Sequence, residues 1–248
     1  MRLQELDKVK SNFIATVSHE LRTPLTSVIG YSEMLLEGLA GDVNEEQAEY
    51  IATIMERGKN LLEMISSLLD VSTVQRGGIE LVREDIDLRK LAAGALGTVR
   101  PQALKRGQIL GQQIAPELPL LYGDRMRLRQ CLVNLLSNAI KFTPDGGEIT
   151  LRIERGFLPG PQDRPGILFA VEDTGIGIPE DHRERIFEAF YQVDNSATRK
   201  YGGAGLGLSL VQSFVEAHHG KVDVETRADK GTVFSFVIPM NGEKDNSA

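Results

Sequence analysis

The chain has 248 residues, of which 41% are hydrophobic and 25% are charged, a balance typical of soluble globular protein with one large core or two smaller ones. Its formal net charge of -7 disfavours general nucleic-acid binding, because proteins bind the phosphate backbone through positively charged surfaces. No apolar run approaches the roughly twenty residues of a membrane helix and no signal-peptide pattern opens the chain, so a cytoplasmic segment is expected.

The N-terminal part of the chain carries the apolar spacing of two helices. Apolar residues recur every three or four positions over 6–39, which indicates one long amphipathic helix. The pattern breaks over 38–42, and Asn44 with Gln47 three positions later predicts a capping box at the start of a second helix. The apolar stripe of that second helix runs over 51–69, so this part is predicted to be a helical hairpin.

A hairpin of two such helices leaves its apolar stripes exposed when it is alone. Two hairpins packed as a four-helix bundle bury those stripes, so residues 1–76 are predicted to form an all-α homodimer. The alternative is that the hairpin packs against the C-terminal half of its own chain.

One histidine, His19, lies on the first helix about 160° around the axis from Val17 and from Leu21. Because Val17 and Leu21 are predicted to face the core, the imidazole is predicted to face solvent, where its neutral nitrogen is a nucleophile. The adjacent Glu20 is placed to accept the proton of the other nitrogen, and Thr23 lies one turn further along the same face. Taken alone, these residues also fit an ordinary solvated surface.

Past the glycines at positions 77 and 78 the apolar spacing changes, which indicates a domain boundary. The segments that follow segregate into an α+β sandwich over 79–240. The predicted strands are 79–86, 108–114, 148–154, 167–173, 221–225 and 232–238. The predicted helices are 88–105, 124–142 and 206–219. Residues 157–165 are predicted to be a hairpin loop, and 241–248 a flexible tail.

Three polar residues share one face of the predicted helix over 124–142. Asn134, Asn138 and Lys141 are spaced four and three positions apart. An amide oxygen is a hard ligand that suits Mg²⁺, and a lysine ammonium suits phosphate. The face therefore fits a magnesium-phosphate group, although solvated polar residues on an amphipathic helix give the same pattern.

Two glycine-rich segments follow. Asp173 stands at a predicted strand end before Gly175 and Gly177, where a carboxylate accepts hydrogen bonds from an exocyclic amine such as that of adenine. Residues 202–208 then open a predicted helix, whose free N–H groups and positive dipole end attract phosphate. Glycine runs of this kind are often only turns, so each segment alone is weak evidence.

Residues 18–25, Ser-His-Glu-Leu-Arg-Thr-Pro-Leu, resemble the H box of the sensor histidine kinases of two-component systems. The resemblance implies that His19 is the phosphoacceptor and that Glu20 assists phosphotransfer. It also implies that Thr23 serves dephosphorylation of a partner response regulator.

The later segments resemble the Bergerat-type ATPase fold, which histidine kinases share with the gyrase, Hsp90 and MutL groups. The face around Asn138 resembles the N box, residues 171–179 the G1 box and residues 202–208 the G2 box. Residues 186–190 resemble the F box of the ATP lid, and residues 231–232 a final glycine motif. The resemblance implies a histidine kinase ATPase-like sandwich that binds ATP and Mg²⁺ and follows a dimeric helical bundle.

That resemblance also implies the roles of the nucleotide-binding residues. Asn138 would ligate Mg²⁺, Asn134 would support the metal or the phosphates, and Lys141 would contact phosphate. Asp173 would bind the adenine amino group. The further nucleotide-binding residues that it implies are Gly175, Gly177, Gly203, Gly205, Leu206, Gly207 and Thr232.

Two residues depart from the family pattern. Ala204 stands where many relatives have Thr or Ser, and Gln192 stands where some have an Arg near the transferred phosphate. The loss of a hydroxyl and of a positive charge is compatible with a slow basal rate of phosphorylation. Phe187 and Phe190 fit ordinary core packing as well as docking of a lid. Three histidines are expected to be solvated or at helix ends and are assigned no chemistry: His182, His218 and His219.

The leading functional hypothesis is a histidine kinase that phosphorylates His19 from ATP and passes the phosphoryl group to an aspartate of a response regulator, with phosphatase activity as well. One alternative is a phosphatase-dominant protein, which Thr23→Ala would separate from a kinase. Another is a pseudokinase scaffold that signals through bundle conformation. A gyrase-like ATPase is disfavoured, because those relatives carry at the position of Asn134 a Glu that activates water.

The chain begins within a heptad-like stripe that includes Leu3, Leu6 and Phe13. It is therefore expected to be the cytoplasmic part of a longer sensor, in which the signal arrives through movement of the helix pair.

Overall fold

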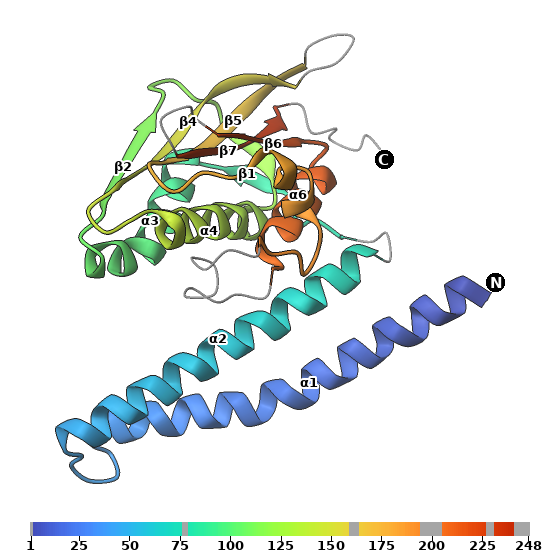
Figure 1. Cartoon of the computed structure of the whole chain (residues 1–248). Helices are drawn as coiled ribbons and strands as arrows, with labels where there is room; N and C mark the ends of the chain where they lie inside the picture. The colour runs from blue at the N-terminus through green and yellow to red at the C-terminus, as the bar shows by residue number, and fades with distance from the viewer. Residues whose placement is uncertain (1, 76–78, 159–163, 194–204, 227–230, 241–248) are drawn as a thin grey trace. The chain divides into compact units, whose positions relative to one another are not determined.

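The computed structural model describes residues 2–75, 79–158, 164–193, 205–226 and 231–240 (Figure 1). The side chains at 2–15, 19, 63, 67 and 71–75 lie outside this description. The chain divides into two compact units, Met1–Gly78 and Ile79–Ala248. The predicted boundary glycines and the predicted tail over 241–248 lie outside the described residues.

The first unit is a hairpin of two long helices, α1 (Arg2–Leu36) and α2 (Glu45–Gln75). α1 continues through Pro24, and its ribbon changes direction along its length (Figure 1). The connection between the helices uses Gly38 and Gly41 at φ values of 74° and 109°, a left-handed region that glycine occupies without a Cβ clash.

The start of α2 confirms the predicted capping box. Gln47 N donates to Asn44 Oδ1 at 2.8 Å, and Asn44 N donates to Gln47 Oε1 at 3.0 Å. Further along the hairpin, Lys59 Nζ of α2 lies 2.8 Å from Glu33 Oε1 of α1. The capping box thus fixes where α2 begins, and the exposed ion pair joins the two helices across the hairpin.

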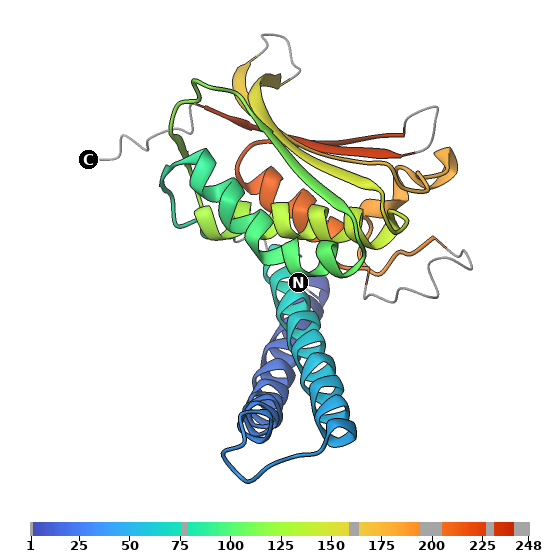
Figure 2. The same cartoon turned by 90° about the vertical axis from the view of Figure 1, so that its left-hand side faces the viewer.

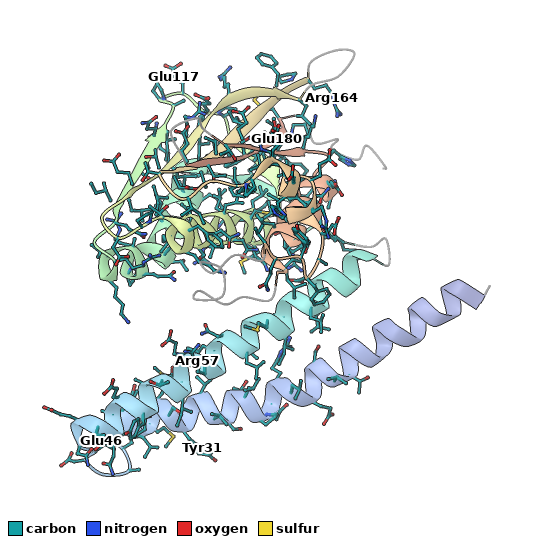
Figure 3. All side chains as sticks on the ribbon, in the orientation of Figure 1. Tyr31, Glu46, Arg57, Glu117, Arg164 and Glu180 are labelled. Carbon is teal, nitrogen blue, oxygen red and sulfur yellow. The ribbon has the colours of Figure 1, made fainter. Side chains whose placement is uncertain are left out.

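A stripe of large apolar side chains remains exposed on this hairpin. Within the described part of the unit it comprises Leu21, Val28, Tyr31, Met34, Leu39, Tyr50, Ile54, Leu61 and Met64. Tyr31, which is 67% exposed, points away from both helices (Figure 3). None of the helices that the structure describes is long and apolar enough to cross a membrane.

The second unit contains helices and strands in two layers. Its strands are β1 (Glu84–Ile86), β2 (Ile109–Ile114), β3 (Leu121–Gly123), β4 (Glu148–Leu158), β5 (Arg164–Asp173), β6 (Lys221–Thr226) and β7 (Thr232–Pro239). Its helices are α3 (Leu88–Lys105), α4 (Arg125–Phe142) and α6 (Gly207–Ala217), with short 3-10 turns η1 (Glu180–His182) and η2 (Arg185–Phe187).

The main sheet has five strands in the order β2-β4-β5-β7-β6, with β2 parallel to β4 and the other neighbours antiparallel. Helices α3, α4 and α6 cover one face of this sheet (Figure 2). Along β7, buried residues alternate with half-exposed ones, as a sheet with one covered face requires. Phe169 and Phe236 stack between neighbouring strands with ring centroids 4.7 Å apart. The arrangement confirms the predicted α+β sandwich.

The strand predictions need three corrections. The strand predicted over 79–86 is wrong in its first part, because its partner β3 offers only three residues to pair with β1. The sequence pattern does not predict β3 itself. The predicted loop over 157–165 is shorter, because β4 and β5 stay paired out to Leu158 and Arg164, where Gly156 lies opposite Gly166.

His218, at the end of α6, is 4% exposed, so the expectation that it is solvated or merely ends a helix is incomplete. Its Nδ1 donates to Phe214 O at 2.7 Å, and its Nε2 accepts from Asp124 N at 2.9 Å, which joins the end of α6 to the start of α4. Burial lowers the pKa of His218; Arg83 and His219 act in the same direction, and Asp124 and the Phe214 carbonyl oppose them.

We expect the free energy of unfolding to fall as the pH drops below about 6.5, because the unfolded chain then binds a proton that buried His218 resists. One such group contributes at most about 1.4 kcal/mol per pH unit. His218→Gln should lower stability near neutral pH and remove this part of the pH dependence, whereas His219→Gln at the exposed neighbour should not. Urea unfolding on either side of about pH 6.5 checks this, and an unchanged pH dependence in His218→Gln would contradict it.

Candidate functional site

The predicted amide and lysine face lies on α4, on the side away from its buried residues. Asp124 caps the helix, its Oδ1 accepting from Arg127 N at 3.0 Å. Asn134, Asn138 and Lys141 are half-buried. The buried side of α4 consists of Leu128, Cys131, Leu132, Leu135, Leu136, Ala139 and Ile140. The core packing of α4 therefore aims the two amides and the lysine at the opposite, accessible side.

Lys141 is the positive charge of this face. Its Nζ lies 4.8 Å from the centre of the Phe142 ring. Burial lowers the pKa of Lys141, because an ammonium that has lost part of its water is less stable than a solvated one. The attraction between an anionic ligand and such a group is stronger than it would be for a fully solvated lysine, because less water screens the pair.

The same face suits a magnesium ion that arrives with phosphate. In the part of the chain that the structure describes, no three His, Cys, Asp or Glu side chains gather to hold a metal by themselves. A neutral amide oxygen from Asn138 together with phosphate oxygens is a ligand set that Mg²⁺ accepts. The residues present therefore fit Mg²⁺ bound jointly with a nucleotide.

Asp173 ends β5 opposite Thr232, the first residue of β7. It is 6% exposed, and its Oδ1 accepts from Gly175 N at 2.8 Å and from Thr232 N at 3.2 Å. A Cβ on Gly175 would lie 2.7 Å from this same oxygen, and one on Gly231 would lie 2.4 Å from Asp173 O. Both glycines are therefore required by the close approach of backbone to Asp173.

The glycine-rich loop after Asp173 is joined to the end of α4. Ile176 N donates to Phe142 O at 3.3 Å. Gly177 adopts a φ of 72°, and a Cβ there would lie 3.0 Å from the Thr226 side chain. The hydrogen bond at Ile176 brings the acidic strand end and the turn that carries Lys141 together, which sequence spacing alone does not predict.

The start of α6 meets the amide face of α4. Asn134 Nδ2 donates to Gly207 O at 3.3 Å, at the first residue of the helix. Leu206 is buried, and Gly205 has a φ of 69°. The first N–H groups of α6 provide the kind of site that binds phosphate. The other glycine predicted for this site, Gly203, lies outside the described residues, as does Ala204.

The segment resembling an F box lies close to the same helix start. Phe187 makes an edge contact with Phe234 at 6.5 Å between ring centroids, so core packing accounts for it. Phe190 is 61% exposed with a φ of 68°, so core packing is the wrong interpretation there. Phe190 N donates to Gly205 O at 2.9 Å, and Gln192 is exposed.

The candidate phosphoacceptor lies in the other unit. His19 is part of α1, but its side chain lies outside the described residues. Glu20 and Thr23 are exposed on the same helix, and Thr23 O accepts from Ser27 Oγ at 3.2 Å. The three residues therefore share one stretch of a helix that carries the exposed apolar stripe.

Family models match both units. Residues 9–77 match the model of the His Kinase A (phospho-acceptor) domain, and residues 123–242 match that of the histidine kinase-, DNA gyrase B-, and HSP90-like ATPases. The chain is 43% identical over 239 residues to the circadian input-output histidine kinase CikA of Thermosynechococcus vestitus, an alignment that covers 96% of this chain and 32% of that protein. It is 39% identical over 235 residues to the sensory/regulatory protein RpfC of Xanthomonas campestris, with 94% and 32% covered. The chain thus spans about a third of the length of these curated relatives.

Solved structures give the same picture. The crystal structure of full-length ShkA in complex with AMPPNP aligns with a TM-score of 0.73 and 33% identity, over 92% of this chain and 45% of that chain. The histidine kinase AdeS of Acinetobacter baumannii aligns with a TM-score of 0.60 and 23% identity over 90% of this chain and 98% of that chain, which is a likeness of fold alone.

Proposed function

Because this chain belongs to the sensor histidine kinase family, we propose that it is a catalytic core that phosphorylates its own His19 from ATP. The observation that carries the proposal is the meeting of three segments around α4. Asn134 donates a hydrogen bond to Gly207 O at the start of α6, and Phe142 O in the last turn of α4 accepts one from Ile176 N in the loop that follows Asp173. These contacts bring together the segments that we propose to bind adenine, the phosphates and Mg²⁺, which supports the proposal.

In the proposed site, Asp173 accepts a hydrogen bond from the amino group of adenine, and the N–H groups at the start of α6 donate to the phosphate oxygens. Lys141 adds positive charge to the phosphates, Asn138 ligates Mg²⁺, and Asn134 supports the metal or the phosphates. Bound Mg²⁺ supplies neutralisation of the charge that develops on the phosphate oxygens. The surrounding shape is proposed to come from the remaining predicted residues, Gly175, Gly177, Gly203, Gly205, Leu206, Gly207 and Thr232.

The proposed transfer uses the imidazole of His19 as nucleophile. Its neutral nitrogen attacks the γ-phosphorus, a nitrogen–phosphorus bond forms as the bond to the bridging oxygen breaks, and ADP leaves. Glu20 accepts the proton from the other ring nitrogen. The phosphoryl group then passes to an aspartate of a response regulator, and Thr23 holds water for hydrolysis of that phosphoaspartate.

The exposed apolar stripe of the hairpin supports a homodimer, because pairing two hairpins removes this surface from water. We expect the double variant Ile54→Asp/Leu61→Asp to be monomeric where the wild type is dimeric, since two charges per chain would be buried in the interface. Ala52→Asp adds a charge to an exposed position on another side of α2 and should leave the dimer intact. Sedimentation equilibrium distinguishes the states, and a wild type that stays monomeric would contradict the dimer.

The test of the proposed function is transfer of label from γ-³²P-ATP in the presence of Mg²⁺. A histidine kinase gives label that survives alkali, is lost in acid and moves to a cognate receiver domain. Binding of ATP without any label would instead support the phosphatase-dominant or scaffold alternatives.

A further inference from the structure

The last turn of α4 is held by two side chains from the connection between α3 and β2. The carbonyl groups at a helix C-terminus have no partner within the helix and need donors from elsewhere. Arg106 Nη1 donates to Ile140 O and, at 3.2 Å, to Lys141 O. Gln108 Nε2 also donates to Ile140 O, at 3.0 Å. Arg106 and Gln108 thus form a clamp on the turn that carries Lys141.

The clamp is built into the interior and continues past the end of the helix. Gln108 is 5% exposed, and its Nε2 also donates to Thr143 O at 2.8 Å and lies 3.3 Å from Pro144 O. Because several carbonyl oxygens converge on it, the amide nitrogen must point this way. Arg106 Nε in turn lies 2.9 Å from Asp145 Oδ1, which fixes the guanidinium.

This turn is also held on the ligand side. Phe142 O accepts from Ile176 N in the loop after Asp173, so the turn is fixed between that loop and the clamp. Asn138 and Lys141 are on this turn or one residue before it, whereas Asp173 is the last residue of β5 and is also held by Thr232 N of β7, which does not depend on the turn. Loosening the clamp should therefore displace the groups for phosphate and metal but not the acceptor for adenine.

We propose that Arg106 and Gln108 are positioning residues that fix Lys141 and Asn138 for the triphosphate and its metal. This inference rests on the proposed nucleotide site. Uncapped carbonyls would let the last turn fray, and a displacement of about 1 Å at a reacting group is enough to cost up to roughly a hundredfold in rate.

The experiment uses Gln108→Met, which keeps the length and the neutral charge of the side chain but removes its donors. Arg106→Lys keeps the positive charge and removes the forked geometry, so an electrostatic effect of lost charge on phosphate is avoided. Displacement of a fluorescent ATP analogue is measured for ATP with Mg²⁺ and for adenosine. Arg129→Ala serves as the matched control, because it removes a half-buried arginine elsewhere on α4, whose Nη2 donates to Thr98 Oγ1.

In both clamp variants the affinity for ATP with Mg²⁺ should fall roughly tenfold, while that for adenosine stays within about twofold. Equal losses for ATP and adenosine, or no loss in variants that melt like wild type, would overturn the positioning role. An intact wild type that binds no ATP would instead overturn the proposed function. A variant that fails to fold is replaced by the other one, because each removes a different half of the clamp.

Discussion

Replacing His19 with alanine is expected to abolish incorporation of acid-labile label from γ-³²P-ATP, by at least about a thousandfold, because no other group in the proposal supplies the attacking nitrogen. ATP affinity should stay within about twofold, since every nucleotide contact proposed here lies in the other compact unit. The measurement is label per chain after equal times, with affinity determined by displacement of a fluorescent analogue.

The matched control is His219→Ala, which removes an exposed histidine at the end of α6. It should be labelled like the wild type. Label that persists in His19→Ala would show that another residue is the phosphoacceptor. A loss of ATP binding in that variant would show that the two units depend on each other for nucleotide affinity.

The parts of the fold that the sequence predicts are those set by short-range interactions. The capping box at Asn44 and Gln47 and the glycine turn before it are made within a few residues, so the ends of the two helices follow from the chain locally. The helix predicted over 88–105 agrees with α3 for the same reason, because Asp87 caps it through Arg89 N and Lys90 N.

Features made by long-range contacts are not predictable in this way. The pair of β1 and β3 depends on two segments of three residues each, which carry too little pattern to be recognised. His218 looks like a helix-end residue until Asp124, distant in sequence, is seen to donate to it. The clamp is similar, because neither Arg106 nor Gln108 has a sequence signal that points to the end of α4.

The candidate site shows the same division. Spacing on one helix places Asn134, Asn138 and Lys141 together, and the structure agrees with that grouping. What spacing does not give is the approach of Gly207 to Asn134 or of Ile176 to Phe142, because those bonds join segments far apart in the chain. Recognition of the family motifs in order compensates for this, since it supplies the tertiary relation that periodicity lacks.

Replacing Asp173 with asparagine is expected to weaken ATP binding by roughly a hundredfold, although the new side chain has the same size. Asp173 Oδ1 accepts from Gly175 N and Thr232 N. Asparagine keeps those two bonds only by placing its carbonyl oxygen there, which puts its NH₂ group where the second carboxylate oxygen lies. A donor would then face the donor amine of adenine in a buried site. Because tenfold in affinity corresponds to about 1.4 kcal/mol, the expected hundredfold loss is a cost of about 2.8 kcal/mol.

Glu172→Gln, at the preceding residue of β5, makes the same chemical change outside the proposed site, in a carboxylate whose Oε1 lies 3.2 Å from Arg152. It should bind ATP within about threefold of wild type, because its side chain pairs with Arg152 and is not one of the groups proposed to bind the nucleotide. Loss of this partly exposed ion pair should lower folding stability by no more than about 1 kcal/mol. If Asp173→Asn also bound ATP within that range and had the melting temperature of the wild type, the amino group of adenine would have to be recognised by backbone groups. The buried carboxylate would then serve only to tie the ends of β5 and β7 to the glycine loop.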